Sequence, residues 1–272
     1  MSTTIDLFPN FLNKHIELPV DERPTEVRFS ASDWADFWRP FLTKLADIRL
    51  RHPRRLMVAV AGPPGVGKST FAAQLNWLLN KGVISGVTSV ALPQDGFHYD
   101  GYYLSSHVRL LPDGSQINLA EVKGAADTFD TVKLKEAIEQ LRAASVNVGW
   151  PGYSRSEHET VSSRFRVPEA VSVVIVEGNY LLVNTGTYEG IPDLFDFKIF
   201  IDCPSTQIVA QLMERHIAGG KTVEEAKAWV KKVDLPNAQL VAGSKNLADI
   251  VLQRNDEGEL EIVAERDTRL AG

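Results

Sequence analysis

The sequence predicts an α/β fold with a mostly parallel sheet and helices on both faces. Apolar segments of strand length alternate with segments whose apolar residues recur at helical spacing, the order typical of parallel sheets. Two of the apolar segments, 56–61 and 171–176, carry no charge, as strands buried on both faces require. Polar and glycine residues follow these strands directly, and in parallel sheets that edge carries the ligand site.

Length and composition favour one main domain with an appendage. A chain of 272 residues suits a single α/β domain with elaborations. The net charge of −6 argues against nucleic acid as the main partner. The single cysteine, Cys203, excludes an internal disulfide and fits a reducing compartment. No segment reaches membrane-spanning length and no signal peptide is apparent, so we expect a cytoplasmic protein without a membrane partner.

Residues 1–54 are expected to form an N-terminal extension, before a main domain at 55–272. The prolines among the first 30 residues indicate a loosely packed arm with a short β segment at 26–29. A helix is expected after Ser32, a good cap residue, and Pro40 either kinks this helix or begins a second one. Its aromatic and aliphatic residues recur at helical intervals, which favours packing on the core over a partner surface.

The most informative segment is a glycine-rich loop between a buried strand and a helix. It has two glycines, a lysine and a hydroxyl residue at the spacing of a phosphate-binding loop. The strand is 56–61, and the helix from 70 to 80 has Phe71 and Leu75 on its apolar face. The sequence therefore predicts a P-loop NTPase fold that binds a nucleoside triphosphate. The nucleotide-binding residues expected are Gly62, Pro63, Pro64, Gly65, Val66, Gly67, Lys68, Ser69 and Thr70.

Residue types within this loop indicate their tasks. Gly65 and Gly67 allow the backbone to approach the phosphates. The strand–loop–helix geometry directs backbone N–H groups and the positive helix end toward an anion. Lys68 would reach the β- and γ-phosphates, and the Ser69 hydroxyl would hold Mg²⁺.

The rest of the chain continues the alternation of strands and helices. The expected elements are strands at 87–92, 145–149, 171–176 and 197–201, helices capped by Asp130, by Ser205 and by Thr222 with Glu225, and a terminal hairpin of 250–253 and 260–263.

Two acids stand at the ends of predicted strands. Asp95 follows the second strand, where a carboxylate can face the γ-phosphate and accept a proton from an attacking hydroxyl, or hold Mg²⁺ through water. A purely structural role for Asp95, as a turn residue before Gly96, explains its presence about equally well. Glu177 ends the strand 171–176, as a metal-binding acid of a nucleotide site does. The alternative is that Glu177 is only a strand-end carboxylate exposed to water. The phosphate-binding loop favours metal binding by Glu177.

Several short motifs occur in a familiar order. They are the phosphate-binding loop, Asp95-Gly96-Phe97-His98, Lys123-Gly124-Ala125 with Thr128-Phe129-Asp130, Trp150-Pro151-Gly152-Tyr153-Ser154-Arg155, Val176-Glu177-Gly178-Asn179-Tyr180-Leu181-Leu182, and Ile217-Ala218-Gly219-Gly220. Together they resemble the P-loop kinases of the uridine kinase, phosphoribulokinase and bacterial pantothenate kinase group. The resemblance covers roughly residues 55 to 253 and is closest to a poorly characterised branch of sugar or nucleoside kinases.

This resemblance implies a reaction and a set of site residues. It implies an enzyme that uses ATP and Mg²⁺ to phosphorylate a hydroxyl group of a small metabolite such as a nucleoside, a sugar or a pantothenate-like compound. Asp95 would be the catalytic base, and Ser69 and Glu177 would belong to the metal site. A small lid at about 211–235 would carry Arg215, which we expect to stabilise charge that develops on the phosphates.

The acceptor site is expected near four residues whose positions match the motifs. They are His98, Lys123, Tyr153 and Arg155. Arg155 is suited to holding a carboxylate or a phosphate. For His98, a loop histidine bonded to backbone is an equal alternative. The sequence does not determine which acceptor is phosphorylated or what residues 111–120 do. It is compatible with a homodimer and does not determine the oligomeric state.

Two other classes of function compete with a kinase. One is a nucleotide-dependent switch that controls a partner protein, although the sequence has no Asn-Lys-x-Asp guanine signature. The other is a binding protein that has kept the nucleotide site and lost catalysis, and the presence of both Asp95 and Glu177 counts against it.

Overall fold

A computed structural model shows how these segments assemble. It describes residues 5, 9–52, 54–111, 113–143, 147–154, 157, 159–255 and 259–266. All statements about structure below concern these residues.

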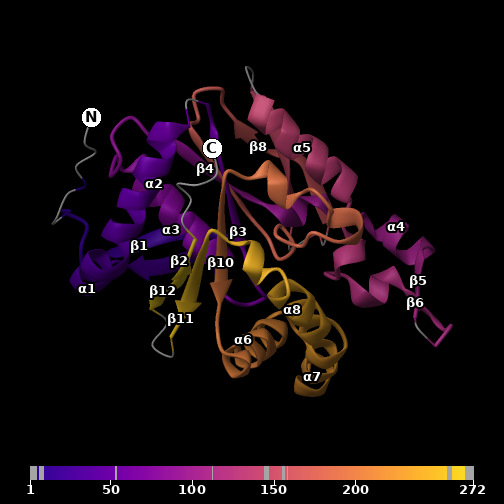
Figure 1. Ribbon diagram of the computed structural model, residues 1–272. Helices are drawn as coiled ribbons and strands as arrows, with labels where there is room; N and C mark the ends of the chain where they lie inside the picture. Colours follow the sequence, from indigo (N-terminus) through magenta and orange to yellow (C-terminus); the bar gives the residue numbers. More distant parts are fainter. Residues whose placement is uncertain are drawn as a thin grey trace.

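A six-stranded sheet forms the centre of the molecule (Figure 1). Its order is β12-β11-β10-β3-β9-β4, and every neighbouring pair is parallel except β11 with β12. The strands are β3 (Leu56–Ala61), β4 (Ser89–Pro93), β9 (Val173–Glu177), β10 (Phe197–Asp202), β11 (Ile250–Arg254) and β12 (Leu260–Glu265). The expected mostly parallel sheet and terminal hairpin are thereby confirmed.

Helices cover both faces of this sheet, as predicted. Helices α2 (Arg39–Arg51) and α3 (Lys68–Asn80) pack on one face, and α5 (Thr131–Ala143) and α8 (Leu235–Ala242) pack on the other (Figure 1). Because side chains alternate along a strand, Val58 belongs to the first core and Met57 to the second. The inner strands β3, β9 and β10 are therefore buried on both sides, whereas the edge strand β12 is largely exposed.

The N-terminal segment is a hairpin rather than the expected loose arm. Strands β1 (His15–Val20) and β2 (Arg23–Arg28) pair antiparallel, and the short strand expected at 26–29 is the end of β2. Pro19 lies opposite Pro24 in this two-stranded sheet. No third strand needs their missing N–H groups, so prolines that indicate a loop in the sequence are compatible with this hairpin.

A helical segment follows the hairpin, although its cap differs from the prediction. Ser30, not Ser32, caps it, since the backbone N–H of Asp33 donates a 2.9 Å hydrogen bond to the Ser30 hydroxyl. The segment consists of α1 (Ala31–Asp33), the π-helical η1 (Trp34–Trp38) and α2, which has Pro40 in its first turn. Its aromatic residues are buried, and Trp38 stacks on Phe71 of α3 with ring centroids 5.5 Å apart. Core packing is confirmed.

A strand overlaps the predicted third strand at 145–149, but it begins at Val148 and does not join the central sheet. Strand β7 (Val148–Ser154) pairs antiparallel with β8 (Glu159–Val167) in a separate hairpin. Pro151 lies within β7, and a proline is excluded from a central strand because it cannot donate a ladder hydrogen bond. Residues 145 and 146 lie outside the described part of the chain.

A long excursion joins β4 to α5. It contains η2 (Gln94–Phe97), α4 (Gly101–Ser106), the hairpin of β5 (Val108–Leu110) and β6 (Gln116–Asn118), η3 (Leu119–Val122) and η4 (Ala126–Thr128). Its apolar side chains form a small cluster that includes Val233, and Lys232 forms a 3.1 Å ion pair with Glu121. The excursion therefore contacts the segment that the sequence identified as a lid.

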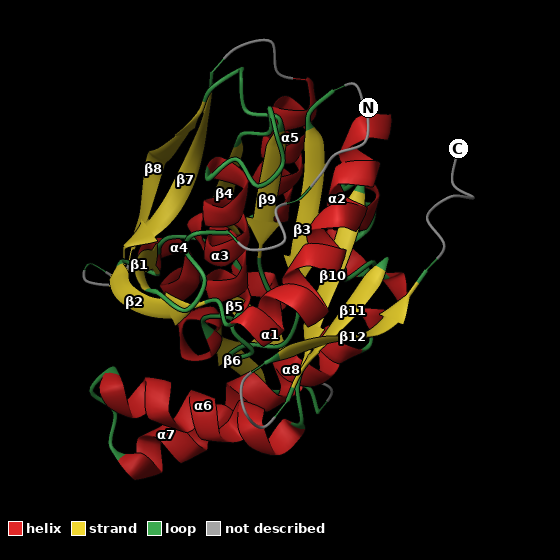
Figure 2. Cartoon of the chain, turned by 90° about the vertical axis from the view of Figure 1, so that its left-hand side faces the viewer, coloured by secondary structure: helices red, strands yellow, loops and turns green. Residues whose placement is uncertain are grey.

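That segment is helical and lies beyond the carboxyl end of β10 (Figures 1 and 2). It comprises α6 (Ser205–Ala218), α7 (Val223–Trp229) and the π-helical η7 (Val230–Asp234). The capping box of Thr222 and Glu225 is confirmed, whereas Pro204 rather than Ser205 occupies the cap position of α6. His216 and Asp234 form a 2.7 Å contact that ties α6 to η7. Short helices η5 (Gly186–Tyr188), η6 (Pro192–Leu194) and η8 (Lys245–Leu247) lie between later elements.

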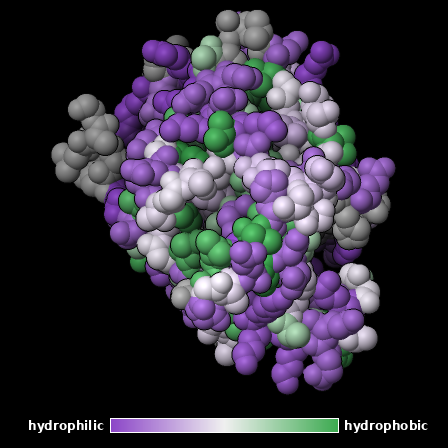
Figure 3. Space-filling model, turned by 90° about the vertical axis from the view of Figure 1, so that its right-hand side faces the viewer, coloured by the Kyte–Doolittle hydropathy of each residue, from purple (hydrophilic) through white to green (hydrophobic). Residues whose placement is uncertain are grey.

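The surface mixes polar and apolar residues. On the face shown in Figure 3, small hydrophobic groups lie among hydrophilic ones. Among the described helices, none has the length and apolar character needed to cross a bilayer.

Candidate active site

The phosphate-binding loop has the geometry that its sequence predicts. It connects the end of β3 to the first residue of α3, and Gly67 occupies the cap position with φ of 89°. Gly65 has φ of 84°. L-residues with side chains rarely adopt these angles, so the glycines let the loop turn sharply into the helix. The positive end of α3 consequently faces the space above the loop.

Lys68 is buried beneath the loop. Its ammonium donates a 2.8 Å hydrogen bond to the Pro63 carbonyl, which orients the side chain along the inside of the loop. Burial lowers the pKa of Lys68, while the negative charges of Glu177 and Asp95 act in the opposite direction. A poorly hydrated ammonium beside an anion-binding helix end is suited to holding phosphate oxygens.

Ser69 and Glu177 come together although 108 residues separate them in sequence. Glu177 ends β9 between Val60 of β3 and Pro93 of β4, which places its carboxylate next to the first turn of α3. The Ser69 hydroxyl donates a 3.2 Å hydrogen bond to Glu177 Oε1. Burial raises the pKa of Glu177, and the charges of Asp21 and Asp95 raise it further.

Asp95 lies at the end of the neighbouring strand, in η2. The residue before it, Gln94, is buried and donates a 3.0 Å hydrogen bond to the Tyr188 hydroxyl. The Gln94 side-chain oxygen accepts a 3.2 Å hydrogen bond from the Tyr180 backbone. These bonds fix the backbone that carries Asp95, and they add Gln94 as a positioning residue that sequence reasoning missed.

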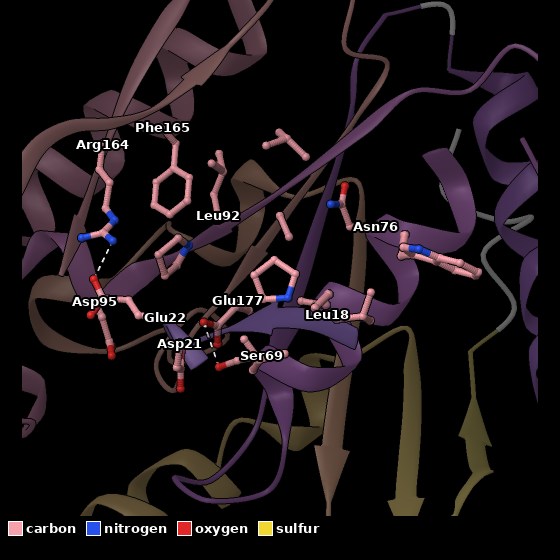
Figure 4. Close-up of a pocket in the computed structure, with 18 of the residues that line it drawn as sticks. Leu18, Asp21, Glu22, Ser69, Asn76, Leu92, Asp95, Arg164, Phe165 and Glu177 are labelled. Atoms are coloured by element: carbon pink, nitrogen blue, oxygen red, sulfur yellow. Dashed lines mark hydrogen bonds and ion pairs between the residues drawn. The ribbon is translucent and has the colours of Figure 1, made fainter. Parts of the chain in front are cut away.

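A cavity of about 540 Å³ opens beside these acids (Figure 4). Ser69, Asp95 and Glu177 line one end, and apolar side chains of α3 and β4 line much of the remainder. The N-terminal hairpin and the β7–β8 hairpin complete the wall. The tip of the N-terminal hairpin, Asp21 and Glu22, was absent from the predicted site, because no local motif marks it.

Three of the predicted acceptor residues lie near this cavity in different ways. Tyr153 lines it, and the Lys123 ammonium lies 4.9 Å from the centre of the Tyr153 ring. The His98 ring lies 5.6 Å from the same ring, but His98 does not line the cavity. Arg155 lies outside the described residues.

His98 is enclosed among aromatic side chains. Its ring centroid is 3.8 Å from that of Phe129, and its Nδ1 is buried without a hydrogen-bond partner among the described residues. Burial lowers the pKa of His98 to about 4, with Asp95 acting against this shift and Lys123 adding to it. The side chain is therefore neutral near pH 7.

Two arginines approach the loop from other parts of the chain. Arg215, in the last turn of α6, is exposed, and its charge adds to burial in lowering the pKa of Lys68. Arg254, at the end of β11, donates a 3.2 Å hydrogen bond from Nε to the Val66 carbonyl. Burial lowers the pKa of Arg254 as well. Sequence reasoning missed Arg254, and its position at the end of the last parallel strand is the signal that marks it.

The residues present fit ATP and Mg²⁺. A side chain at Gly67 would clash with the Arg254 guanidinium, so this conformation of the phosphate-binding loop requires glycine at position 67. The Ser69 and Glu177 oxygens are hard ligands of the kind that Mg²⁺ prefers. Among the described residues, no group of three or more His, Cys, Asp or Glu could hold a metal ion. In nucleotide sites Mg²⁺ is usually held by one or two protein oxygens together with phosphates, and Ser69 with Glu177 can provide such a pair.

Comparison with known families decides the class. The Phosphoribulokinase / Uridine kinase family matches residues 57–261, which is most of the chain. The chain belongs to this family. It is accordingly a small-molecule kinase with a P-loop fold, and family membership implies the use of ATP.

Proteins similar to this chain carry several different functional names. The uncharacterized protein YggC of Escherichia coli (strain K12) is 31% identical over 244 residues, covering 89% of this chain and 97% of YggC. Pantothenate kinase of Ligilactobacillus salivarius (strain UCC118) is 24% identical and covers 92% of both chains. A candidate fructose transport system kinase from Silicibacter sp. TM1040 superimposes with a TM-score of 0.63 and 29% identity, over 74% of this chain and 93% of that chain.

Proposed function

We propose that this kinase transfers the γ-phosphoryl group of ATP to a hydroxyl group of a small metabolite in a Mg²⁺-dependent reaction. The observation that carries the proposal is the convergence of Ser69, Glu177 and Asp95 at one end of a cavity beside the phosphate-binding loop. A metal-binding pair and a separate carboxylate at the rim of a nucleotide site are what phosphoryl transfer to an alcohol requires.

Each side chain has a task in this reaction. Residues 62–70 hold the triphosphate through backbone N–H groups, and Lys68 neutralises charge on the β- and γ-phosphates. Ser69 and Glu177 would hold Mg²⁺, which would supply positive charge that offsets the charge of the phosphates. Asp95 takes the proton from the acceptor hydroxyl while that oxygen forms its bond to the γ-phosphorus and the bond to ADP breaks. Asp95 can also contact the metal through water.

The helical segment 211–235 is proposed as the lid. Arg215 extends from α6, and we assign it to the charge that develops during transfer. The His216–Asp234 contact makes α6 and η7 one unit, so the segment is suited to moving as a body. Residues 1–54 form the extension, and 55–272 the kinase domain.

The acceptor belongs to the class of small hydroxyl compounds. Names of relatives include pantothenate kinase, a candidate uridine kinase and a candidate fructose transport system kinase, so all three acceptor types are candidates. Tyr153 is a proposed acceptor contact because it lines the cavity, and Lys123 is another because its ammonium lies 4.9 Å from the centre of the Tyr153 ring. His98 is proposed to support the shape of this wall, and Arg155 stays a predicted acceptor residue.

A screen for ADP release tests the proposed function. The purified protein would be supplied with ATP and Mg²⁺, with and without uridine, D-fructose, D-glycerate or pantothenate. We expect slow turnover alone and a large increase with one acceptor, accompanied by the phosphorylated acceptor in mass spectra. Turnover that no acceptor stimulates would contradict the proposal and favour a nucleotide-dependent switch.

A further inference from the structure

The N-terminal hairpin reaches the candidate acceptor cavity. Asp21 and Glu22, at its tip, line the cavity together with Ser69, Asp95 and Glu177 (Figure 4). These two residues precede the part of the chain that matches the kinase family, which begins at residue 57. The hairpin therefore lies outside the segment that the family model matches and still contributes directly to the cavity.

The backbone at this tip is unusual. Asp21 and Glu22 have φ of 48° and 65°, and they form the two-residue connection between the paired residues Val20 and Arg23. Connections of this kind favour glycine, asparagine and aspartate, whereas a longer side chain such as that of Glu22 costs on the order of 1 kcal/mol in the left-handed region. Two acids held in this conformation next to an active site indicate a function for their side chains.

The hairpin is anchored firmly behind its tip. Leu18, Val20 and Val27 are buried in the core that includes α3 and the first helical segment. Leu18 and Val20 also line the cavity, so one strand carries both the anchor and the wall. The tip is thereby held at the cavity by the same packing that stabilises the domain.

Glu22 joins this tip to the β7–β8 hairpin across the cavity. It forms a 2.5 Å ion pair with Arg164 of β8, which Figure 4 shows. The register of β8 shifts next to Arg164, and Ser163 has φ of 52°. Bulges of this kind redirect a side chain near active sites. A side chain on Gly152 would lie 3.1 Å from Arg164 Cβ, so glycine on the opposite strand leaves room for the arginine.

The charges along this cavity are unbalanced. Its described lining carries four carboxylic acids, Asp21, Glu22, Asp95 and Glu177, and a single cationic side chain, Arg164. The ion pair with Glu22 already compensates that cation. Asp21 and Glu177 line the same cavity. Lys68 and Lys123 lie nearby but do not line the cavity. The lining itself therefore disfavours a second anion and offers several hydrogen-bond acceptors.

We infer that Asp21 and Glu22 belong to the acceptor site and make this kinase selective for uncharged polyhydroxyl acceptors over anionic ones. The inference rests on the proposed function, because it assigns the acceptor to this cavity. The carboxylates accept hydrogen bonds from acceptor hydroxyl groups, and they disfavour carboxylates and phosphate esters by like-charge repulsion. Asp21 and Glu22 are thus specificity-determining residues contributed by the N-terminal extension.

Matched pairs of acceptors test this inference. Suitable pairs are D-fructose with 2-keto-D-gluconate, uridine with orotidine, pantothenol with pantothenate, and glycerol with D-glycerate, since the members of each pair differ by one carboxylate. For the pair that contains the best substrate, we expect kcat/KM to favour the neutral member at least tenfold. In the double variant Asp21→Asn/Glu22→Gln this preference should fall at least tenfold, mainly through a higher KM for the neutral member and a lower KM for the anion.

Two further variants complete the experiment. Glu17→Gln removes an exposed carboxylate from the same hairpin, outside the cavity, and should keep the wild-type preference. Asp21→Asn alone keeps the Glu22–Arg164 ion pair and should lose part of the preference, even where the double variant does not fold. A preference for the anionic member, or an equal preference in wild type and both folded variants, overturns the inference while leaving a kinase. Absence of transfer to every compound overturns the proposed function and the inference with it.

Discussion

The Ser69 hydroxyl donates a 3.2 Å hydrogen bond to the carboxylate of Glu177, which ends the strand beside the phosphate-binding loop. This pair joins the first turn of α3 to β9, so the geometry of the loop and of the proposed metal site are set together. If the pair holds Mg²⁺, loss of the Glu177 charge should weaken metal binding more than it weakens ATP binding.

Glu177→Gln tests this role with little change of shape. We expect the Mg²⁺ concentration for half-maximal rate to rise about tenfold or more, since one hard anionic ligand becomes neutral. Excess Mg²⁺ should recover part of kcat. The measurement is a Mg²⁺ titration of the acceptor-dependent rate, and an unchanged titration curve would assign Glu177 to a structural role.

Lys68→Ala should abolish transfer and weaken ATP binding. The substitution removes the side-chain cation of the loop, and a hydrogen bond to a charged group contributes ~1.5–3 kcal/mol, or roughly 10- to 150-fold in affinity. Calorimetric titration with an ATP analogue and a steady-state assay measure the two effects. Lys81→Ala, which removes an exposed lysine at the other end of α3, provides the matched control. Normal turnover in folded Lys68→Ala protein would contradict the assignment of the active site.

Arg215→Ala should lower kcat more than it raises the KM for ATP. The proposed partner of Arg215 is charge that develops during transfer, so its loss affects the transition state more than the bound substrate. Lys227→Ala removes an exposed cation from the neighbouring helix and serves as the control. A loss of ATP affinity with normal kcat would show that Arg215 only helps to hold the nucleotide, and no change would make it a solvated helix residue.

Acid should destabilise the protein through His98. Its pKa falls from the ordinary 6.5 to about 4 because the side chain is buried. Between these values the unfolded chain binds a proton that the folded protein does not, so stability decreases as pH falls through this window. His98→Asn should reduce that slope by up to about 1.4 kcal/mol per pH unit. Urea unfolding at several pH values between 4 and 6.5 measures the slope, with exposed His107→Asn as control. Equal slopes in His98→Asn and wild type would show that His98 is not the group responsible.

Local patterns in the sequence predicted the nucleotide half of the site. The loop at 62–69 is encoded by contiguous residues, and the flanking apolar strand and helix make its conformation predictable. Glu177 and Asp95 were found for a related reason, because strands that are parallel bring their carboxyl ends to one edge of the sheet. The register of β9 between β3 and β4 confirms this placement.

The acceptor half depends on contacts that no local pattern encodes. Asp21 and Glu22 reach the cavity only because the N-terminal hairpin packs on α3, and its prolines suggested a loop instead. Arg164 faces Glu22 because of an irregularity in β8, and single-sequence periodicity does not show such a shift. Arg254 contacts Val66 across 188 residues of sequence. Tertiary packing, rather than propensity, decides these positions.

The most direct test of the central claim is the kcat of acceptor phosphorylation by Asp95→Asn, measured across a Mg²⁺ titration with the best acceptor from the screen. The amide keeps the size of the side chain and removes its ability to take a proton. We predict a fall in kcat of about 10²–10⁴-fold, with little change in Mg·ATP affinity and no recovery at high Mg²⁺. Recovery at high Mg²⁺ would show that Asp95 is chiefly a metal ligand, and a kcat close to that of the wild type would contradict its role as the base.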